Sequence, residues 1–245
     1  MKILHTTQPP CIWWCVTSPL AFLPLHAAGL YCKKELGFQA RDFVTSSYTP
    51  MLTTLLDVAN TTKHPNFQLL AIVQPFTQWY PELPNTTQEL KHIQNHAQRG
   101  NLAIQILKRD DATVESVVKH MQKSSWLHLA CHGEQNVEYL LKSALLLQHD
   151  GCLVLWQIVN MPLLNAEFVF MSACQTAMGD KGLLEEAIHL VAGMLLAGYW
   201  EVIAMTWSIQ DKYVPVVADD LYECLFADEQ PDHTQAAHAL HSAVQ

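Results

Sequence analysis

The stretches Trp126-Leu127-His128-Leu129-Ala130-Cys131-His132-Gly133 and Phe168-Val169-Phe170-Met171-Ser172-Ala173-Cys174 decide the fold of this chain. Each begins with a continuous apolar run of strand length, which is typical of a strand buried on both faces of a parallel sheet. Each run stops at a reactive side chain, His132 or Cys174. Because neighbouring parallel strands end at the same crevice, where ligands bind in α/β sheets, these two ends can bring a histidine and a cysteine together.

Strand and helix patterns alternate on either side of these two runs. Apolar runs predict further strands at residues 12–16, 67–73, 102–107 and 202–205. Helical spacing predicts helices at residues 20–31, 49–60, 86–99, 113–123, 184–197 and 214–226. Thr86 and Glu89 form a capping-box pattern at the start of one of them. The alternation predicts an α/β fold with a doubly wound, mostly parallel sheet flanked by helices.

A β-hairpin is expected between the two reactive strand ends. The apolar runs 144–147 and 152–155 flank His149-Asp150-Gly151. Asp-Gly between apolar runs is a strong short-range hairpin signal. Further along, the segment from residue 232 begins a helix that is still running at Gln245, which we take for a truncated end.

Composition narrows the class of protein. Of the 245 residues, 50% are hydrophobic and 15% are charged, which argues against disorder. The net charge of −9, with no basic stripe, makes nucleic acid an unexpected partner. Seven cysteines without a C-x-x-C pair predict neither disulfides nor a zinc ribbon, and a reducing, cytoplasmic location fits best. Pro19 and Pro24 interrupt the apolar segment near the start, so no membrane contact is expected.

His132 and Cys174 have the chemistry of a Cys-His dyad. A thiol attacks as the thiolate and needs a base such as histidine beside it. Gly133 and the residues that follow Cys174 supply backbone N–H groups that can hold an oxyanion. A buried core cysteine and a core histidine are the alternative. We expect a structural role for His128 and His189. His26 can either reach the site or cap a helix.

Several motifs follow one another in a fixed order. They are Phe22-Leu23-Pro24-Leu25-His26-Ala27-Ala28-Gly29, Ser46-Ser47-Tyr48-Thr49-Pro50, the stretch 127–133, Ser143-Ala144-Leu145-Leu146-Leu147 with Asp150-Gly151, the stretch 166–177, Glu186-Ala187-Ile188-His189-Leu190-Val191-Ala192-Gly193, Ala197-Gly198-Tyr199 and Thr206-Trp207-Ser208-Ile209-Gln210-Asp211. In this order they resemble the CHAT domain, a caspase-like and separase-like module commonly found behind tetratricopeptide repeats (TPR). The likeness covers nearly the whole chain.

The resemblance implies a caspase-like α/β fold and peptide-bond hydrolysis. In that family's pattern His132 matches the general base and Cys174 the nucleophile, and the N–H groups of Gly133 and Cys174 match the oxyanion hole. The expected domain covers residues 9–226, followed by a helical tail at residues 227–245 that is truncated before a final strand. Trp200 departs from the pattern, because a basic residue is common there.

The leading hypothesis is therefore a cysteine protease, a hydrolase of protein or peptide substrates in regulated signalling or cell-death-like proteolysis. No metal or organic cofactor is expected, and an activating partner would act through a repeat region. The second hypothesis is a catalytically inactive caspase-like scaffold, and the third is a redox-sensing thiol at Cys174. Acidic residues that could set a preference for a basic substrate side chain are Asp150, Asp180, Glu185, Glu186 and Asp211.

Overall fold

In a computed structural model, the chain is described at residues 9–16, 23–32, 36–49, 66–134, 136, 138–172, 183–205, 211–228 and 230–244, with the backbone alone at 150, 183–189 and 211. This part of the chain forms a five-stranded sheet, a three-stranded sheet and a two-stranded sheet. The predicted helix at residues 49–60 lies outside the described residues except for Thr49.

The five-stranded sheet is the centre of the molecule, and all its strand pairs are parallel. From one edge to the other it consists of β10 (Glu201–Ala204), β9 (Phe168–Met171), β5 (Trp126–Ala130), β3 (Leu69–Val73) and β4 (Ile104–Lys108). Every residue of β3, β5 and β9 is buried. The continuous apolar runs of the sequence therefore correspond to strands covered on both faces.

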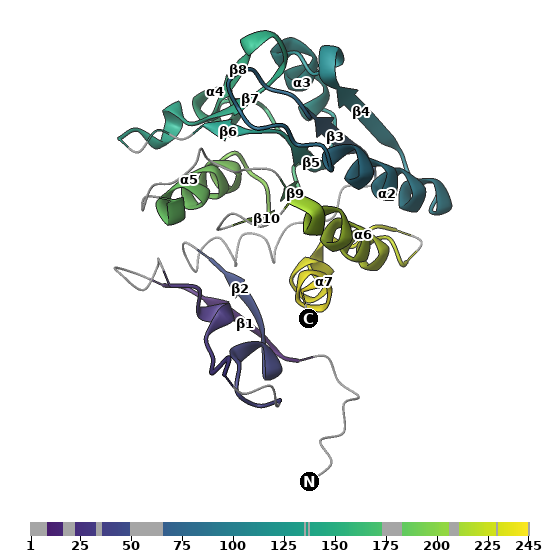
Figure 1. Ribbon diagram of the computed structural model, residues 1–245. Coiled ribbons are helices and arrows are strands. Elements are labelled where there is room, and N and C mark those ends of the chain that lie inside the picture. Colours follow the sequence, from purple (N-terminus) through teal and green to yellow (C-terminus); the bar gives the residue numbers. More distant parts are fainter. Residues whose placement is uncertain are drawn as a thin grey trace.

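Helices cover both faces of this sheet. One face, with Leu127 and Leu129, packs against α3 (Val114–Met121), α4 (Leu155–Val159) and α5 (Leu183–Leu196). The other, with Trp126 and Phe168, packs against α2 (Thr86–Arg99), α6 (Val214–Leu225) and α7 (Ala236–Ala243). Figure 1 shows α4 and α5 on one side of the sheet and α2 and α6 on the other. The predicted α/β fold, a mostly parallel sheet flanked by helices as in a caspase-like fold, is confirmed.

Local signals placed most helix ends correctly. The Thr113 side chain accepts a hydrogen bond from Ser116 N at the start of α3, and Gly198 has a φ of 106° just after α5, a conformation that glycine adopts without strain. The predicted capping box of α2 is wrong. The residue before the helix is Asn85, no side chain caps it, and the Thr86 hydroxyl donates to Leu83 O instead. The carboxylate of Glu89 contacts Ser172 and His128 instead.

The three-stranded sheet consists of β6 (Gly133–Glu134), β7 (Ala144–Leu146) and β8 (Cys152–Val154), which pair antiparallel. The connection between β7 and β8 lies where the sequence predicted a hairpin, but the Asp-Gly turn is not formed. His149 has the left-handed conformation, with φ of 56°, whereas Gly151 is extended, with φ of −70°. Glycine fits at 151 because a Cβ there would lie 2.9 Å from both Gln148 O and Val114 Cγ2.

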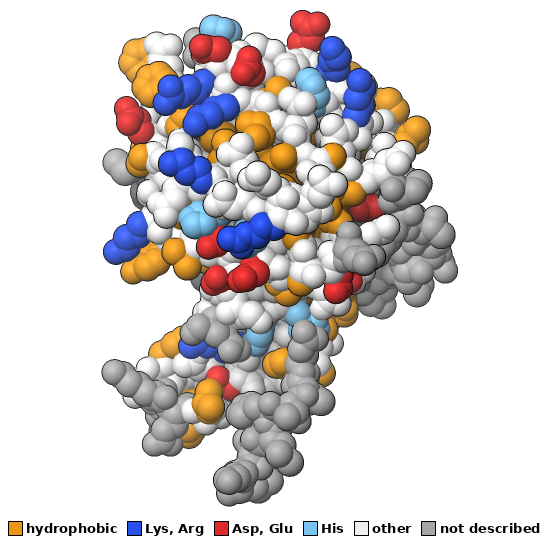
Figure 2. All heavy atoms as spheres, turned by 90° about the vertical axis from the view of Figure 1, so that its right-hand side faces the viewer, with side chains coloured by type: hydrophobic (Ala, Val, Ile, Leu, Met, Phe, Trp, Pro, Cys, Tyr) orange, Lys and Arg blue, Asp and Glu red, His pale blue; other side chains and the backbone are white. Residues whose placement is uncertain are grey.

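An N-terminal unit, residues 9–49 as far as they are described, lies beside the main body. Its strands β1 (Cys11–Trp14) and β2 (Thr45–Tyr48) pair parallel and do not join the central sheet. The predicted strand at 12–16 therefore exists at 12–14 only, and of the helix predicted at 20–31 the described part holds a short 3-10 turn at Leu25–Ala27. In Figures 1 and 2 the unit forms a narrower lobe, and α7 packs against both β2 and α6.

Candidate functional site

The carboxyl ends of β5 and β9 lie side by side, as the sequence predicted. Four residues of β5 each face the residue 42 positions later in β9, from Trp126 opposite Phe168 to Leu129 opposite Met171. The amide of Ser172 donates to Leu129 O at 3.0 Å, so the pairing continues one residue past β9. Cys174 lies outside the described residues. The structure therefore places the histidine half of the predicted dyad.

His132 lies two residues beyond β5 and is only 2% exposed. Its Nε2 atom is 2.8 Å from the carbonyl oxygen of Pro81. Because a carbonyl oxygen only accepts, Nε2 must carry the proton, and Nδ1 of the neutral ring then has a free lone pair. Among the described residues Nδ1 is buried without a hydrogen-bond partner. His132 therefore presents an anchored ring with one unused basic nitrogen.

The loop between β3 and α2 holds this ring in place. The Tyr80 ring packs on His132 with the centroids 5.1 Å apart and the planes tilted by 35°. The loop is closed by Leu83 N donating to Pro75 O at 2.9 Å and Tyr80 N donating to Thr77 O at 3.1 Å. Partial burial, and then the neighbouring Glu134 and Cys152, raise the pKa of Tyr80 above its usual value. A neutral phenol therefore covers one face of the imidazole.

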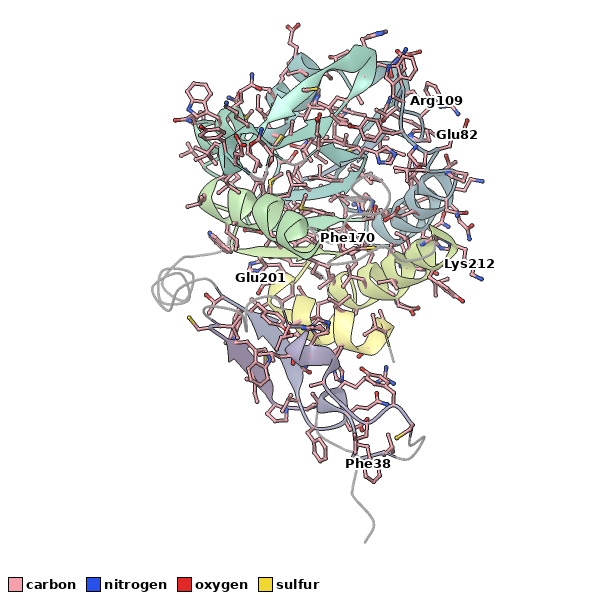
Figure 3. All side chains as sticks on the ribbon, turned by 60° about the vertical axis from the view of Figure 1, so that its left-hand side comes forward. Phe38, Glu82, Arg109, Phe170, Glu201 and Lys212 are labelled. Atoms are coloured by element: carbon pink, nitrogen blue, oxygen red, sulfur yellow. The ribbon has the colours of Figure 1, made fainter. Side chains whose placement is uncertain are left out.

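Sequence reasoning did not assign Pro81 or Tyr80 to the site. The available signal was a proline-rich loop, residues 75–84, which follows the carboxyl end of a predicted strand next to the histidine strand. Loops at that edge of a parallel sheet surround its ligand crevice. Figure 3 shows Glu82 of this loop and Arg109, which follows β4, at the same end of the molecule.

Gly133 lies next to His132 as the first residue of β6, opposite Leu145 of β7. The amide of Leu146 donates to His132 O at 2.8 Å. In an antiparallel pair this bond makes positions 133 and 145 a non-hydrogen-bonded pair. The N–H of Gly133 therefore points away from β7 and takes no part in the β6–β7 ladder.

Cys131 and His128 are not part of this arrangement. Burial raises the pKa of the Cys131 thiol to about 12, and its side chain packs in the core on the α3, α4 and α5 side of the sheet. His128 is fully buried, with Nδ1 3.1 Å from the hydroxyl of Tyr222. Its predicted structural role agrees with these contacts.

The remaining candidates lie apart from His132 or outside the described side chains. His26 contacts Tyr48 of β2, with Nδ1 2.9 Å from the hydroxyl, so it belongs to the N-terminal unit. The side chain of His189 is not described, nor are those of the acidic candidates Asp150, Asp180, Glu185, Glu186 and Asp211. In the described ranges no group of three or more metal-ligating side chains is arranged to hold a metal. No described helix is both long enough and apolar enough to cross a bilayer.

Comparison with known proteins adds one finding. A search of curated proteins gave no match. The family model of the CHAT domain matches residues 4–245. That match extends over the N-terminal unit, the central sheet and the end of α7. The chain therefore belongs to the CHAT domain family.

Proposed function

We propose that this protein is a caspase-like cysteine endopeptidase in which His132 and Cys174 form the catalytic dyad. The observation that carries the proposal is the state of His132. Its ring is buried at the carboxyl end of a central strand, its Nε2 is fixed by the Pro81 carbonyl, and its Nδ1 has no described partner. A buried base without a partner costs stability, and such groups concentrate at functional sites.

The register of the sheet supports Cys174 as the partner of Nδ1. The offset of 42 residues between β5 and β9 is also the separation of His132 and Cys174 in the sequence. Side chains alternate between the two faces of a sheet. Continued by two residues beyond Ser172, the pairing would set position 174 opposite His132 on the face that α2 covers. Among the described residues, no cysteine has this relationship to a histidine at a strand end.

The proposed reaction needs no cofactor. Nδ1 of His132 takes the thiol proton of Cys174, and the thiolate sulfur bonds to the carbonyl carbon of the scissile peptide. The N–H groups of Gly133 and Cys174 donate to the resulting oxyanion. When the C–N bond breaks, the imidazolium gives its proton to the leaving amine. A water molecule then gives a proton to Nδ1 while its oxygen bonds to the thioester carbonyl carbon. The C–S bond breaks, the acid leaves, and the imidazolium returns its proton to the sulfur of Cys174.

The substrate of this proposal is a protein or peptide, and the proposed setting is regulated proteolysis in the cytoplasm, switched on by an activating partner. Neither nucleic acid nor a membrane takes part. On the face shown in Figure 2, acidic and basic side chains are interspersed rather than gathered by sign. Interspersed charge of this kind offers no extended basic surface for a phosphate backbone.

A peptide-library digest tests the proposal. The unmodified chain is incubated with a proteome-derived peptide mixture, and new termini are identified by mass spectrometry. We expect cleavage that disappears in Cys174→Ala and in His132→Ala and persists in Cys152→Ala, which removes an exposed thiol from β8. Folded protein without cleavage would favour the scaffold hypothesis. Selective sulfenic acid formation at Cys174 without cleavage would favour the redox hypothesis.

A further inference from the structure

A chain of buried polar groups runs beneath the carboxyl end of β9. Glu89, in the first turn of α2, is 1% exposed. Its Oε2 accepts a hydrogen bond from the Ser172 hydroxyl at 3.0 Å. Its Oε1 lies 3.1 Å from His128 Nε2, at ion-pair distance but not aligned for a hydrogen bond. One carboxylate therefore links α2 to two neighbouring strand segments of the central sheet.

The hydroxyl of Tyr222 determines which nitrogen of His128 carries the ring proton. Burial, and then the charge of Glu89, raise the pKa of Tyr222 well above its usual value, so its hydroxyl keeps its proton. That hydroxyl can donate to Nδ1 of His128, 3.1 Å away. Nε2 then carries the ring proton and faces the Glu89 carboxylate. A proton-bearing group therefore lies beside each oxygen of the carboxylate, and the one at Oε2 is hydrogen-bonded.

Burying the carboxylate of Glu89 between a helix and a sheet costs desolvation free energy. Replacing buried charged groups with well-packed apolar residues is often neutral or stabilising. The neighbouring contacts are already apolar and aromatic, since His128 stacks on Phe170 at 5.3 Å and Phe170 packs on Tyr222. Figure 3 shows Phe170 in the sheet beside α6. The polar chain therefore contributes directional constraint more than stability.

The constraint acts at Ser172. Its main-chain N–H is held by Leu129 O and its side chain by Glu89. Both the register of Ser172 in the sheet and its position relative to α2 are therefore fixed. Cys174 follows two residues later. Glu89 lies in the first turn of α2, where an acidic side chain is favourably placed in the field of the helix macrodipole.

We propose that Glu89 and Ser172 are positioning residues that set the strand end leading to Cys174 against His132. This inference rests on the proposed dyad. Neither residue touches the substrate or the dyad itself in this role. They act through the geometry of the main chain, and a misplacement of about 1 Å between reacting groups can cost roughly a hundredfold in rate.

The test measures kcat and KM for a cleaved peptide, together with the pH dependence of Cys174 alkylation by iodoacetamide, in Ser172→Ala, Glu89→Gln and the double variant. Positioning predicts that kcat falls about tenfold to a hundredfold with little change in KM. It also predicts that the alkylation profile moves toward that of an ordinary thiol. Because the two residues act as one unit, the double variant should lose little more than either single variant.

Asp219→Asn is the matched control. Asp219 of α6 contacts Nε2 of His96 at 2.6 Å and Nδ1 of His92 at 3.1 Å, so it also links α6 to α2 through polar groups but does not reach β9. The control should leave kcat and the alkylation profile unchanged. Thermal unfolding of each variant separates altered positioning from loss of the fold.

Three outcomes overturn the inference in different ways. If Cys174 of the unmodified chain shows no His132-dependent reactivity, the proposed function fails and the inference falls with it. If that reactivity is present but survives in folded Ser172→Ala and Glu89→Gln, the dyad stands and the positioning role is wrong. An equal loss in Asp219→Asn would show that any polar link to α2 matters, and the specific role of Glu89 and Ser172 would then be wrong.

Discussion

Nε2 of His132 lies 2.8 Å from the carbonyl oxygen of Pro81, a residue 51 positions earlier in the chain. The bond joins the end of β5 to the loop that follows its neighbour β3. It fixes both the orientation of the imidazole and the nitrogen that carries the proton. The basic nitrogen is thereby selected by a main-chain group, which side-chain substitution cannot remove directly.

Substitution of Tyr80 tests whether its ring helps to hold His132 in place. Tyr80→Ala removes the ring that packs on His132, so the imidazole gains freedom and kcat for peptide cleavage should fall about tenfold to a hundredfold. Tyr80→Phe keeps the ring and should retain most of the activity. Steady-state kinetics on the two purified variants makes the comparison. Equal activity in both would show that the ring does not hold the histidine.

His128 should matter for stability rather than for chemistry. His128→Ala removes a fully buried ring and leaves the carboxylate of Glu89 buried without its neighbour. We expect the free energy of unfolding to fall by about 3–5 kcal/mol, the usual cost of truncating a fully buried aromatic ring and leaving a cavity. Denaturant unfolding measures it.

His92→Ala is the control for this prediction. His92 lies on the same polar side of α2, but its side chain is 29% exposed beside Asp219. Loss of a partly exposed polar contact of this kind should change the stability by no more than about 1 kcal/mol. Equal destabilisation by the two variants would contradict the structural importance of the buried contact.

Cys131 should stay unreactive although it is the neighbour of His132. Burial raises its pKa from 9.0 to about 12, so the native thiol is protonated at pH 9 and out of reach of the reagent. Iodoacetamide should modify exposed Cys152 in the folded protein and Cys131 only after unfolding, as mapped by mass spectrometry. Modification of Cys131 at the rate of Cys152 would contradict its place in the core.

The same shift has a consequence for stability at high pH. A thiol whose pKa is raised by folding favours the folded state fully below its unfolded value, and this contribution is lost as the pH rises toward the folded value. For Cys131 that window runs from pH 9.0 to about 12. The stability of the fold should therefore decline across this range.

The sequence predicted the central sheet well because its strands are apolar on both faces. The apolar runs at 126–130 and 168–171 stand out from the more polar sequence around them, and they end shortly before His132 and Cys174. β2 escaped prediction because Thr45-Ser46-Ser47-Tyr48 is polar and pairs only with β1, outside the main core. Its pairing depends on tertiary contacts that periodicity does not encode.

Two features of the site region could not be derived from the sequence. The contact of Pro81 is made by a backbone carbonyl, which every residue has, so no side-chain pattern marks it. Glu89 fits a capping box with Thr86, and this local interpretation is wrong because its carboxylate points to Ser172, 83 residues later. Long-range polar contacts of this kind are specified by packing rather than by spacing.

The most direct test of the dyad is the alkylation rate of Cys174 as a function of pH, in the unmodified chain and in His132→Ala. The modified residue is identified by mass spectrometry, and His26→Ala serves as a histidine control from the N-terminal unit. We predict that Cys174 reacts rapidly well below pH 8.5, about where an ordinary thiol is half ionised, and that only His132→Ala abolishes this reactivity. The same profile in folded His132→Ala as in the unmodified chain would contradict the account.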